Sequence, residues 1–317
     1  MLELDINDSV FVAGHGGLVG SAIIRKLKAD GFTNILTANR SDVDLRNQAQ
    51  VNAWFEDNQP KYVFLVAGTV GGIHANATRP AEFLYDNMMI HATVVHASYV
   101  NNVEKLVYLG SSCIYPRLAN QPMTEDQLLS GPLEPTNEPY AIAKIAGIKL
   151  CDTYREQYGC NFVSGMPTNL YGPNDNFDLE SSHVLPALMR KFHDAKLMGL
   201  DSVEIWGSGT ARREFLHVDD LADACLFLLR NYNSSGQINI GTGKEVSIQE
   251  LAETLRDVIY PDAELHWDTT KPDGAPRKLL DVSKIEAAGW SHSIALSDGI
   301  NSTYEWFTDH YENVRGR

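Results

Sequence analysis

The first half of the chain alternates between short apolar runs and longer stretches whose apolar residues recur every three or four positions. Runs of this length are typical of buried strands, and the longer repeat is typical of helices. The pattern predicts strands at 10–13, 34–37, 62–66, 105–109 and 162–166, and helices at 18–27, 80–101 and 140–158. Alternating strands and helices form a parallel sheet covered on both faces, so the sequence predicts an α/β fold with a doubly wound parallel sheet.

This rhythm changes after residue 173. Residues 174–182 are polar and irregular, and further segments follow: helices to about 195 and at 247–259 and 297–308, strands at 203–206 and 237–240, and a short strand and helix within 217–230. We expect a dinucleotide-binding domain at 1–173, to which 214–242 returns. A smaller C-terminal substrate-binding domain would comprise 174–213 and 243–317.

A glycine-rich segment follows the first predicted strand and opens the first predicted helix. Its spacing, Gly14-x-x-Gly17-x-x-Gly20, differs by one residue from the commoner G-x-G-x-x-G. Glycines let the backbone approach a pyrophosphate, and a helix N-terminus offers free N–H groups and a partial positive charge. The segment therefore predicts a dinucleotide site that includes Gly14, Gly17, Leu18, Val19 and Gly20.

The end of the second predicted strand bears on the choice of cofactor. NAD sites usually place an acidic residue there to hold the ribose hydroxyls. This chain has Ala38-Asn39-Arg40-Ser41 instead, and Arg40 and Ser41 suit a 2′-phosphate. NADP is therefore favoured, although Asp42 keeps NAD as an alternative.

The fourth predicted strand and the helix at 140–158 supply candidate catalytic groups. Gly110-Ser111-Ser112-Cys113 follows the strand, at the edge where parallel strands point into a ligand crevice. Tyr140 and Lys144 are four residues apart, so both lie on one helix face. We expect the ammonium to lower the pKa of the phenol and to make Tyr140 an acid–base group at neutral pH.

Composition narrows the class of protein. The chain has 317 residues and a formal net charge of −15, which argues against nucleic-acid or acidic-membrane surfaces, although a local basic pocket is compatible. It has no apolar run long enough for a transmembrane helix and no signal-peptide layout. The cysteines, Cys113, Cys151, Cys160 and Cys225, form no Cys-x-x-Cys pair, so neither a metal site nor a disulfide framework is predicted. We expect a cytoplasmic protein.

Several motifs resemble one known family. The glycine loop, the string Ser111-Ser-Cys-Ile-Tyr-Pro116 and the Tyr140–Lys144 pair resemble the extended short-chain dehydrogenase/reductase family. Three longer strings are similar to the GDP-L-fucose synthase family, a branch of it: Glu134-Pro-Thr-Asn-Glu-Pro-Tyr-Ala-Ile-Ala-Lys144, Met166-Pro-Thr-Asn-Leu-Tyr-Gly172 and Trp206-Gly-Ser-Gly-Thr210. The similarity covers nearly the whole chain. It implies a Rossmann sheet and a homodimer formed through the helices at about 80–101 and 140–158.

The resemblance also implies an activity. Members of this branch epimerise a GDP-4-keto-6-deoxymannose at carbons 3 and 5, then reduce carbon 4 with NADPH to give GDP-L-fucose. By resemblance, Ser111, Tyr140 and Lys144 would serve the reduction, and Cys113 and His183 the epimerisations.

The same resemblance implies two binding sets. Cofactor residues would be Arg40, Leu109, Gly110, Ser111, Ser112, Tyr140, Lys144, Pro167, Thr168, Asn169, Leu170 and His183. Substrate residues would be Asn169, Lys191, Trp206, Arg213, Asp273 and Lys278. Two positions depart from the family pattern: Gly16 stands where an arginine often lies near the 2′-phosphate, and Lys191 replaces a frequent arginine, which removes a bidentate phosphate contact.

The implied chemistry suits these residue types. Hydrogens beside a ketone are acidic because the resulting anion delocalises onto the oxygen, so one ketone at carbon 4 activates carbons 3 and 5. Inversion needs a base on one face and an acid on the other, and cysteine (pKa about 8.5) and histidine (about 6.5) bracket neutral pH. Ser111 and Tyr140 would hydrogen-bond the ketone oxygen as charge develops there.

Three other functions stay open. A sugar-nucleotide 4,6-dehydratase or 4-epimerase is the nearest, although a dehydratase should carry an acidic pair where this chain has Ser112-Cys113-Ile114. A related epimerase–reductase acting on a GDP-heptose or GDP-dideoxysugar would share the same motifs. A cofactor-binding sensor without turnover should have lost one of Ser111, Tyr140 or Lys144, and all three are present.

Overall fold

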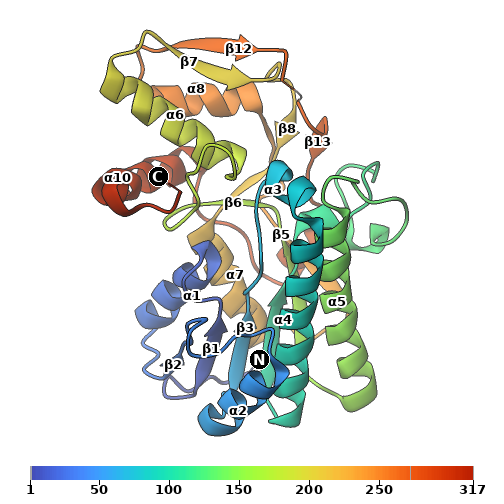
Figure 1. Cartoon of the computed structure of the whole chain (residues 1–317). Coiled ribbons are helices and arrows are strands. Elements are labelled where there is room, and N and C mark those ends of the chain that lie inside the picture. The colour runs from blue at the N-terminus through green and yellow to red at the C-terminus, as the bar shows by residue number, and fades with distance from the viewer. Residues whose placement is uncertain (1, 272, 317) are drawn as a thin grey trace.

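A parallel six-stranded sheet lies at the centre of the larger part of the molecule (Figure 1). The computed structural model describes residues 2–271 and 273–316. In spatial order the strands are β10 (Gln237–Ile240), β5 (Phe162–Pro167), β4 (Lys105–Leu109), β3 (Tyr62–Leu65), β1 (Val10–Ala13) and β2 (Ile35–Leu36). Every neighbouring pair in this sheet is parallel, which confirms the predicted fold class.

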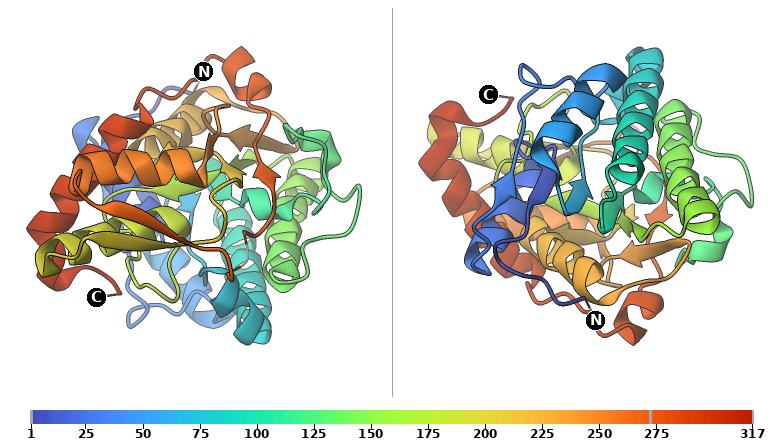
Figure 2. Two further views of the ribbon diagram at one scale, coloured as in Figure 1. Left: turned by 90° about the horizontal axis from the view of Figure 1, so that it is seen from above. Right: turned by 90° about the horizontal axis from the view of Figure 1, so that it is seen from below.

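Helices cover both faces of the sheet, as the view from below shows (Figure 2). One face carries α2 (Gln48–Asn58), α4 (Pro80–Val100) and α5 (Glu138–Tyr158), and the other carries α1 (Leu18–Ala29) and α7 (Val218–Asn231). Because both faces are covered, every residue of β1, β3 and β4 is buried. This explains why these strands read as continuous apolar runs in the sequence.

A smaller part of the molecule stands above the carboxyl ends of these strands (Figure 1). It contains α6 (Val184–Met198), α8 (Ile248–Ile259), α10 (Leu296–His310) and two small sheets. In one sheet β7 (Ser202–Trp206) pairs in parallel with β12 (Glu264–Asp268), and in the other β8 (Arg212–Arg213) lies between β11 (Val246–Ser247) and β13 (Arg277–Lys278). A second hydrophobic core fills this part, with Phe192, Leu251, Leu255 and Phe307 among its buried members.

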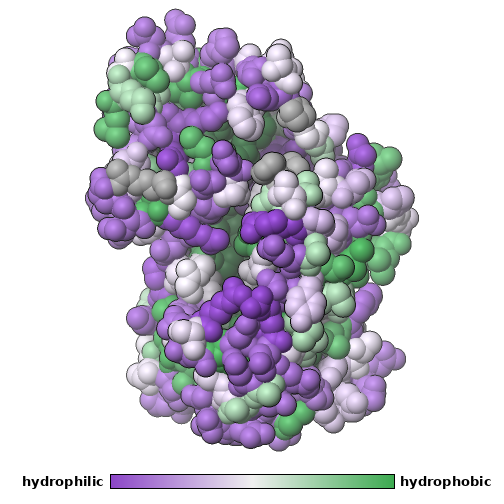
Figure 3. Space-filling view, in the orientation of Figure 1, coloured by the Kyte–Doolittle hydropathy of each residue, from purple (hydrophilic) through white to green (hydrophobic). Residues whose placement is uncertain are grey.

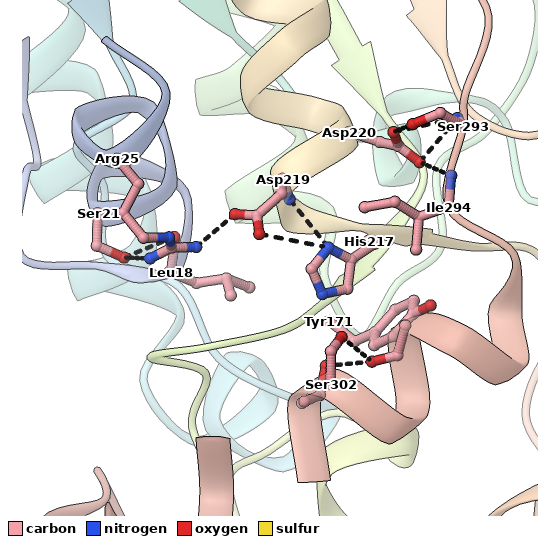
Figure 4. A network of polar contacts seen from close by, with 12 residues as sticks. Leu18, Ser21, Arg25, Tyr171, His217, Asp219, Asp220, Ser293, Ile294 and Ser302 are labelled. Atoms are coloured by element: carbon pink, nitrogen blue, oxygen red, sulfur yellow. Dashed lines mark hydrogen bonds and ion pairs between the residues drawn. The ribbon is translucent and has the colours of Figure 1, made fainter. Parts of the chain in front are cut away.

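A short parallel pair joins the two parts: β6 (Asn169–Tyr171) beside β9 (Phe215–His217). The buried His217 ends β9 and caps α7, because its Nδ1 accepts the Asp219 N–H at 3.2 Å. Figure 4 shows this ring between the Arg25–Asp219 ion pair and Tyr171. The remaining elements are α3 (Ile73–Thr78), α9 (Ser283–Ala287) and 3-10 helices at Ser112–Ile114, Glu125–Gln127 and Tyr311–Asn313.

The two hydrophobic cores bear on the predicted domain boundaries. Residues 214–242 supply β10 and α7, which pack in the larger part. The buried side chains of Leu280, Val282, Ile285 and Trp290 also lie in the larger core, although the sequence placed 243–317 in the smaller domain. The boundaries themselves remain a prediction.

Most of the face in Figure 3 is hydrophilic, and it is hollowed between the larger and smaller parts. Within residues 2–271 and 273–316, no helix has both the length and the apolar character needed to cross a membrane.

Candidate active site

The glycine loop packs tightly between β1 and α1. Gly14 has φ of +99°, and a Cβ there would lie 2.7 Å from the Ala67 backbone. A Cβ on Gly20 would lie 2.1 Å from the Gly14 carbonyl oxygen. Gly17 precedes α1 without a side-chain cap, so the first N–H groups of the helix are available to a phosphate. This cradle fits a dinucleotide pyrophosphate.

The loop after β2 holds the residues expected at the ribose. Arg40 is exposed there, and Asp42 accepts the Asn39 N–H at 2.9 Å. That bond lowers the pKa of Asp42, so its carboxylate is already engaged within the loop. A Cβ on Gly16 would contact nothing within 4 Å, so the glycine leaves open space on that side of the loop.

The helix α5 holds Tyr140 and Lys144 at the carboxyl end of β4. The Lys144 ammonium donates to the Leu109 carbonyl at 2.8 Å and lies 5.8 Å from the centre of the Tyr140 ring. Lys144 is 4% exposed, and burial lowers its pKa to about 8. The common face predicted from their spacing is therefore present.

The predicted effect on Tyr140 is wrong in this structure. Burial raises the pKa of the phenol well above 10, and the neighbouring Cys113 raises it further, against a hydrogen bond with Ser111. Desolvation of the phenolate dominates, and the Lys144 ammonium is directed at the Leu109 carbonyl. Tyr140 is therefore a protonated donor at neutral pH.

Ser111 and Cys113 follow β4 directly. Ser111 caps the 3-10 helix at Ser112–Ile114, and its Oγ accepts the Cys113 N–H at 3.5 Å. Burial raises the pKa of the Cys113 thiol, whereas the Lys278 ammonium and the Ser111 hydroxyl act in the opposite direction. The thiol is therefore the resting form at neutral pH.

His183 comes from the smaller part, at the residue before α6. The surrounding protein atoms lower the pKa of its ring, and the Lys278 ammonium lowers it further. The Lys278 ammonium lies close enough to Cys113 and to His183 to shift the pKa of each. The site thus combines a thiol with a neutral imidazole.

The loop after β5 lies beside these groups. Pro167 ends β5, and the Thr168 N–H bonds to the carbonyl of Ile240 at 3.0 Å. Asn169 opens β6, and its Nδ2 donates to the Glu214 carbonyl at 2.8 Å. This pairing fixes the segment that the sequence assigned to both cofactor and sugar.

The smaller part gathers positive charge around an exposed indole. Trp206 is 53% exposed at the end of β7. The Lys191 ammonium lies 4.8 Å from the centre of its ring, and the Lys271 ammonium lies 5.2 Å from it. Lys191 also donates to the Glu204 carbonyl at 3.0 Å. This arrangement suits a ligand with negative charge and a flat or apolar face.

The β8–β13 pair brings two more cations beside this group. Arg213 and Lys278 are direct partners in the parallel register. Desolvation lowers the pKa of Arg213, and Asp273 opposes that shift. The Asp273 carboxylate accepts the Ser208 N–H at 2.6 Å and the Ser208 hydroxyl at 2.9 Å, so it already holds the loop after β7.

Three residues with evident roles in this site were not predicted. Lys271 belongs to a basic loop visible in the sequence, but its position over Trp206 is a tertiary contact. Asn87 on α4 accepts the Thr69 N–H at 3.0 Å and so holds the loop after β3. Glu214 is fully buried behind Arg213. Neither Asn87 nor Glu214 carries a sequence signal, because each acts through backbone groups far away in the chain.

Comparisons with known proteins agree with this geometry. Residues 10–241 match the NAD dependent epimerase/dehydratase family. The chain is 56% identical to GDP-L-fucose synthase 1 of Arabidopsis thaliana over 303 residues, which cover 96% of this chain and 94% of the relative.

Two solved structures are also similar. A GDP-L-fucose synthetase from Naegleria fowleri bound to NADP is 30% identical, with a TM-score of 0.92 and coverage of 99% of this chain and 98% of the other. A GDP-D-glycero-L-gluco-heptose synthase from Campylobacter jejuni, determined in the presence of NADPH, is 37% identical, with a TM-score of 0.91 and coverage of 96% and 100%.

Proposed function

The chain belongs to the NAD dependent epimerase/dehydratase family, and on that basis we propose that it converts GDP-4-keto-6-deoxy-D-mannose to GDP-L-fucose, with epimerisation at carbons 3 and 5 and NADPH-dependent reduction at carbon 4. One observation carries this proposal: Cys113 lies beside the Ser111–Tyr140–Lys144 group, and the Lys278 ammonium influences the pKa of both Cys113 and His183. A reductase without epimerase activity needs only Ser111, Tyr140 and Lys144. The 56% identity to a GDP-L-fucose synthase supports the choice of sugar.

The cofactor would lie along the carboxyl edge of the sheet. The glycine loop and the N-terminus of α1 would hold its pyrophosphate, and Arg40 its 2′-phosphate. The remaining proposed contacts follow β4 and β5 and include His183: Leu109, Gly110, Ser111, Ser112, Tyr140, Lys144, Pro167, Thr168, Asn169 and Leu170. When bound, NADPH supplies the hydride.

Epimerisation needs one group that removes a proton and one that returns it. Cys113 rests as a thiol and His183 as a neutral imidazole, so transfer of the thiol proton to the imidazole would give a thiolate that can remove a proton and an imidazolium that can return one. Proton removal by Cys113 requires the thiolate, which the ammonium of Lys278 stabilises. Ser111 and Tyr140 would hydrogen-bond the ketone oxygen while carbon 3 or carbon 5 is deprotonated.

Reduction would use the same oxygen-binding groups. Tyr140 is protonated in the folded protein, so it can deliver a proton to the carbon 4 oxygen. Lys144 stands beside the ring, and its pKa of about 8 allows it to restore that proton near neutral pH. The two reactions would thus proceed in one site without release of the sugar.

The GDP part would bind in the smaller part of the molecule. Lys191, Arg213 and Lys278 can meet the diphosphate, and Trp206 offers an exposed aromatic face. Asn169 and Asp273 border this region. The net charge of the chain is −15, so this cationic group is a local feature that favours an anionic ligand.

One alternative substrate is also supported by the comparisons. The similarity to the Campylobacter jejuni heptose synthase makes a GDP-heptose the second candidate. A dehydratase is disfavoured because Ser111-Ser112-Cys113 follows β4 without a carboxylate.

We also propose a cytoplasmic homodimer with the two-domain division given by the sequence. Four free cysteines fit a reducing compartment. Large apolar side chains are exposed on α4 and α5: Tyr85, Met88, Val100, Ile142 and Tyr158. The two helices pack against each other, so this face can pair with its own copy about a twofold axis.

The dimer has a direct test. Light scattering at micromolar concentration should give the mass of two chains for wild type and of one chain for Met88→Asp combined with Ile142→Asp. Leu197→Asp is the matched control, since Leu197 is 65% exposed but lies on α6. A monomeric wild type would end the dimer proposal.

The activity is tested by following NADPH oxidation with a panel of GDP-linked keto sugars. GDP-4-keto-6-deoxymannose should be consumed fastest and should give GDP-L-fucose by proton NMR. Faster consumption of a GDP-keto-heptose would move the assignment to the alternative, and no oxidation with any GDP-keto sugar would reject the proposed function.

A further inference from the structure

A buried carboxylate lies directly behind the proposed substrate site. Glu214 stands between Arg213 and β9, and its side chain is 0% exposed. Its Oε1 accepts the N–H groups of Thr242 at 2.6 Å and Gly243 at 2.8 Å, and its Oε2 accepts the Leu280 N–H at 3.0 Å. Among residues 2–271 and 273–316, no cation forms an ion pair with it.

A buried carboxylate without a cation is costly, so these contacts need a reason. Burial raises the pKa of Glu214, and the backbone N–H groups oppose that shift. The approach is close enough that a Cβ on Gly241 would lie 2.2 Å from Oε1. Only glycine is compatible with this packing at residue 241.

The N–H groups held by Glu214 belong to segments that are far apart in the chain. Thr242 and Gly243 follow β10, whereas Leu280 follows β13. The Glu214 backbone carbonyl in addition accepts from Asn169 Nδ2 at 2.8 Å. One residue therefore ties together the segments after β5, β10 and β13.

These segments carry residues of the site. Leu280 is two residues beyond Lys278, and Lys278 pairs with Arg213, the residue before Glu214. The Lys278 ammonium influences both Cys113 and His183. Displacement of the Leu280 backbone would therefore move a cation shared by the diphosphate region and the epimerising pair.

We propose that Glu214 is a positioning residue whose carboxylate, through the Leu280 N–H, fixes Lys278 beside Arg213 and thereby sets where the GDP-sugar lies relative to Cys113 and His183. The inference rests on the proposed function for the identity of the sugar. The placement of Lys278 and Arg213 is inferred from the hydrogen bonds of Glu214 and does not depend on the proposed function. Glu214 has no contact with the reacting atoms in this account.

The test compares Glu214→Gln with Asp220→Asn. Glutamine keeps the size of the side chain but turns an amide –NH₂ toward one of the N–H donors, so one segment loses its acceptor. Asp220 is the matched control because it is 4% exposed and also accepts backbone N–H groups, those of Ser293 at 3.1 Å and Ile294 at 2.9 Å (Figure 4). The segment that Asp220 holds, around Ser293 and Ile294, contains none of the proposed site residues.

For Glu214→Gln, we expect the dissociation constant for GDP and the KM for the keto sugar to rise about tenfold, the effect of displacing one charged contact. The dissociation constant for NADPH should stay within about twofold, because the N–H groups that the carboxylate holds, those of Thr242, Gly243 and Leu280, lie outside the proposed cofactor residues. Asp220→Asn should lower the unfolding midpoint about as much as Glu214→Gln does. It should leave the dissociation constants for GDP and NADPH and the KM for the keto sugar within about twofold of wild type.

A second variant covers the case in which Glu214→Gln does not fold. Gly241→Ala inserts a methyl group where Oε1 now lies, and so displaces the carboxylate while its charge is retained. The same selective loss of GDP affinity is expected. Unchanged GDP affinity in both Glu214→Gln and Gly241→Ala, or an equal loss in Asp220→Asn, would overturn the proposal.

The GDP measurement separates this proposal from the function itself. GDP binding by calorimetry needs no turnover, so a wild type that binds GDP but leaves every keto sugar unchanged would reject the proposed function alone. The comparison of variants would still decide the role of Glu214.

Discussion

Replacing Lys144 with methionine should abolish reduction and at the same time stabilise the fold. Lys144 is 4% exposed, and its pKa falls from 10.5 to about 8. Each pKa unit corresponds to about 1.4 kcal/mol, so the buried charge costs the folded state roughly 3 kcal/mol at neutral pH. Methionine has a similar length and carries no charge, so its burial has no comparable desolvation cost.

The net gain is smaller because methionine cannot donate to Leu109. The lost hydrogen bond, now 2.8 Å long, offsets about 1–2 kcal/mol. About 1–2 kcal/mol of stabilisation remains, which for a chain of this size raises the unfolding midpoint by roughly 2 °C. Differential scanning calorimetry at pH 7 measures this shift, and NADPH oxidation measures the loss of reduction, expected to be at least ~10².

The pH dependence checks the cause. Below about pH 8 lysine is charged in both the folded and the unfolded chain, and the folded state bears the full cost of burial. Between about 8 and 10.5 the unfolded chain binds more protons, so the stability of wild type rises with pH toward that of the variant. The variant should therefore have the higher midpoint below about pH 8 and the lower midpoint near pH 10.5, because the roughly 3 kcal/mol that wild type recovers exceeds the net gain of about 1–2 kcal/mol.

Lys105 provides the matched control. It is 2% exposed, donates to the Tyr232 carbonyl at 2.6 Å, and burial lowers its pKa to about 8. Lys105→Met should show a similar shift in stability and keep the reductase activity. The reasoning about the buried charge would be refuted if the unfolding midpoint fell by several degrees in both variants. It would also be refuted if the difference in midpoint between variant and wild type did not change with pH.

Further predictions concern the cofactor and the proton donor. Arg40→Ala should weaken NADPH binding about tenfold or more and NADH binding little, since a charged hydrogen bond is worth roughly 1.5–3 kcal/mol; equal losses in a fluorescence titration would contradict the phosphate contact. Tyr140→Phe should slow reduction by at least ~10² with unchanged NADPH binding, and a wild-type rate would remove Tyr140 from the mechanism. Gly14→Ala places a Cβ 2.7 Å from the Ala67 backbone and should abolish NADPH binding, whereas Gly16→Ala, which meets no atom within 4 Å, should not; equal effects would contradict this cradle.

Features with a local cause were predictable from the sequence. Buried parallel strands read as apolar runs, and β1, β3, β4 and β5 lie within about a residue of their predicted limits. The glycine loop was recognisable because tight turns and close backbone approach leave few residue types possible. The shared face of Tyr140 and Lys144 followed from helix geometry alone.

Features with a tertiary cause were not predictable. Helix α2 has few buried residues, so its apolar pattern is weak. The two-residue strands β8 and β13 exist only as partners of each other and β11. The high pKa of Tyr140 reflects burial, which the four-residue spacing cannot reveal. The role of Glu214 depends on N–H groups that lie 28 to 66 residues away.

Hydrogen exchange in heavy water tests the central claim, a site that both epimerises and reduces. The enzyme is incubated with GDP-4-keto-6-deoxymannose and NADP⁺ in place of NADPH, and the recovered sugar is examined by mass spectrometry and proton NMR. We predict deuterium at carbons 3 and 5 in wild type, little or none in Cys113→Ser because an alcohol ionises far less readily than a thiol, and a deuterated, reduced product once NADPH is added. Reduction by wild type without deuterium at either carbon would contradict the account and leave a simple ketoreductase.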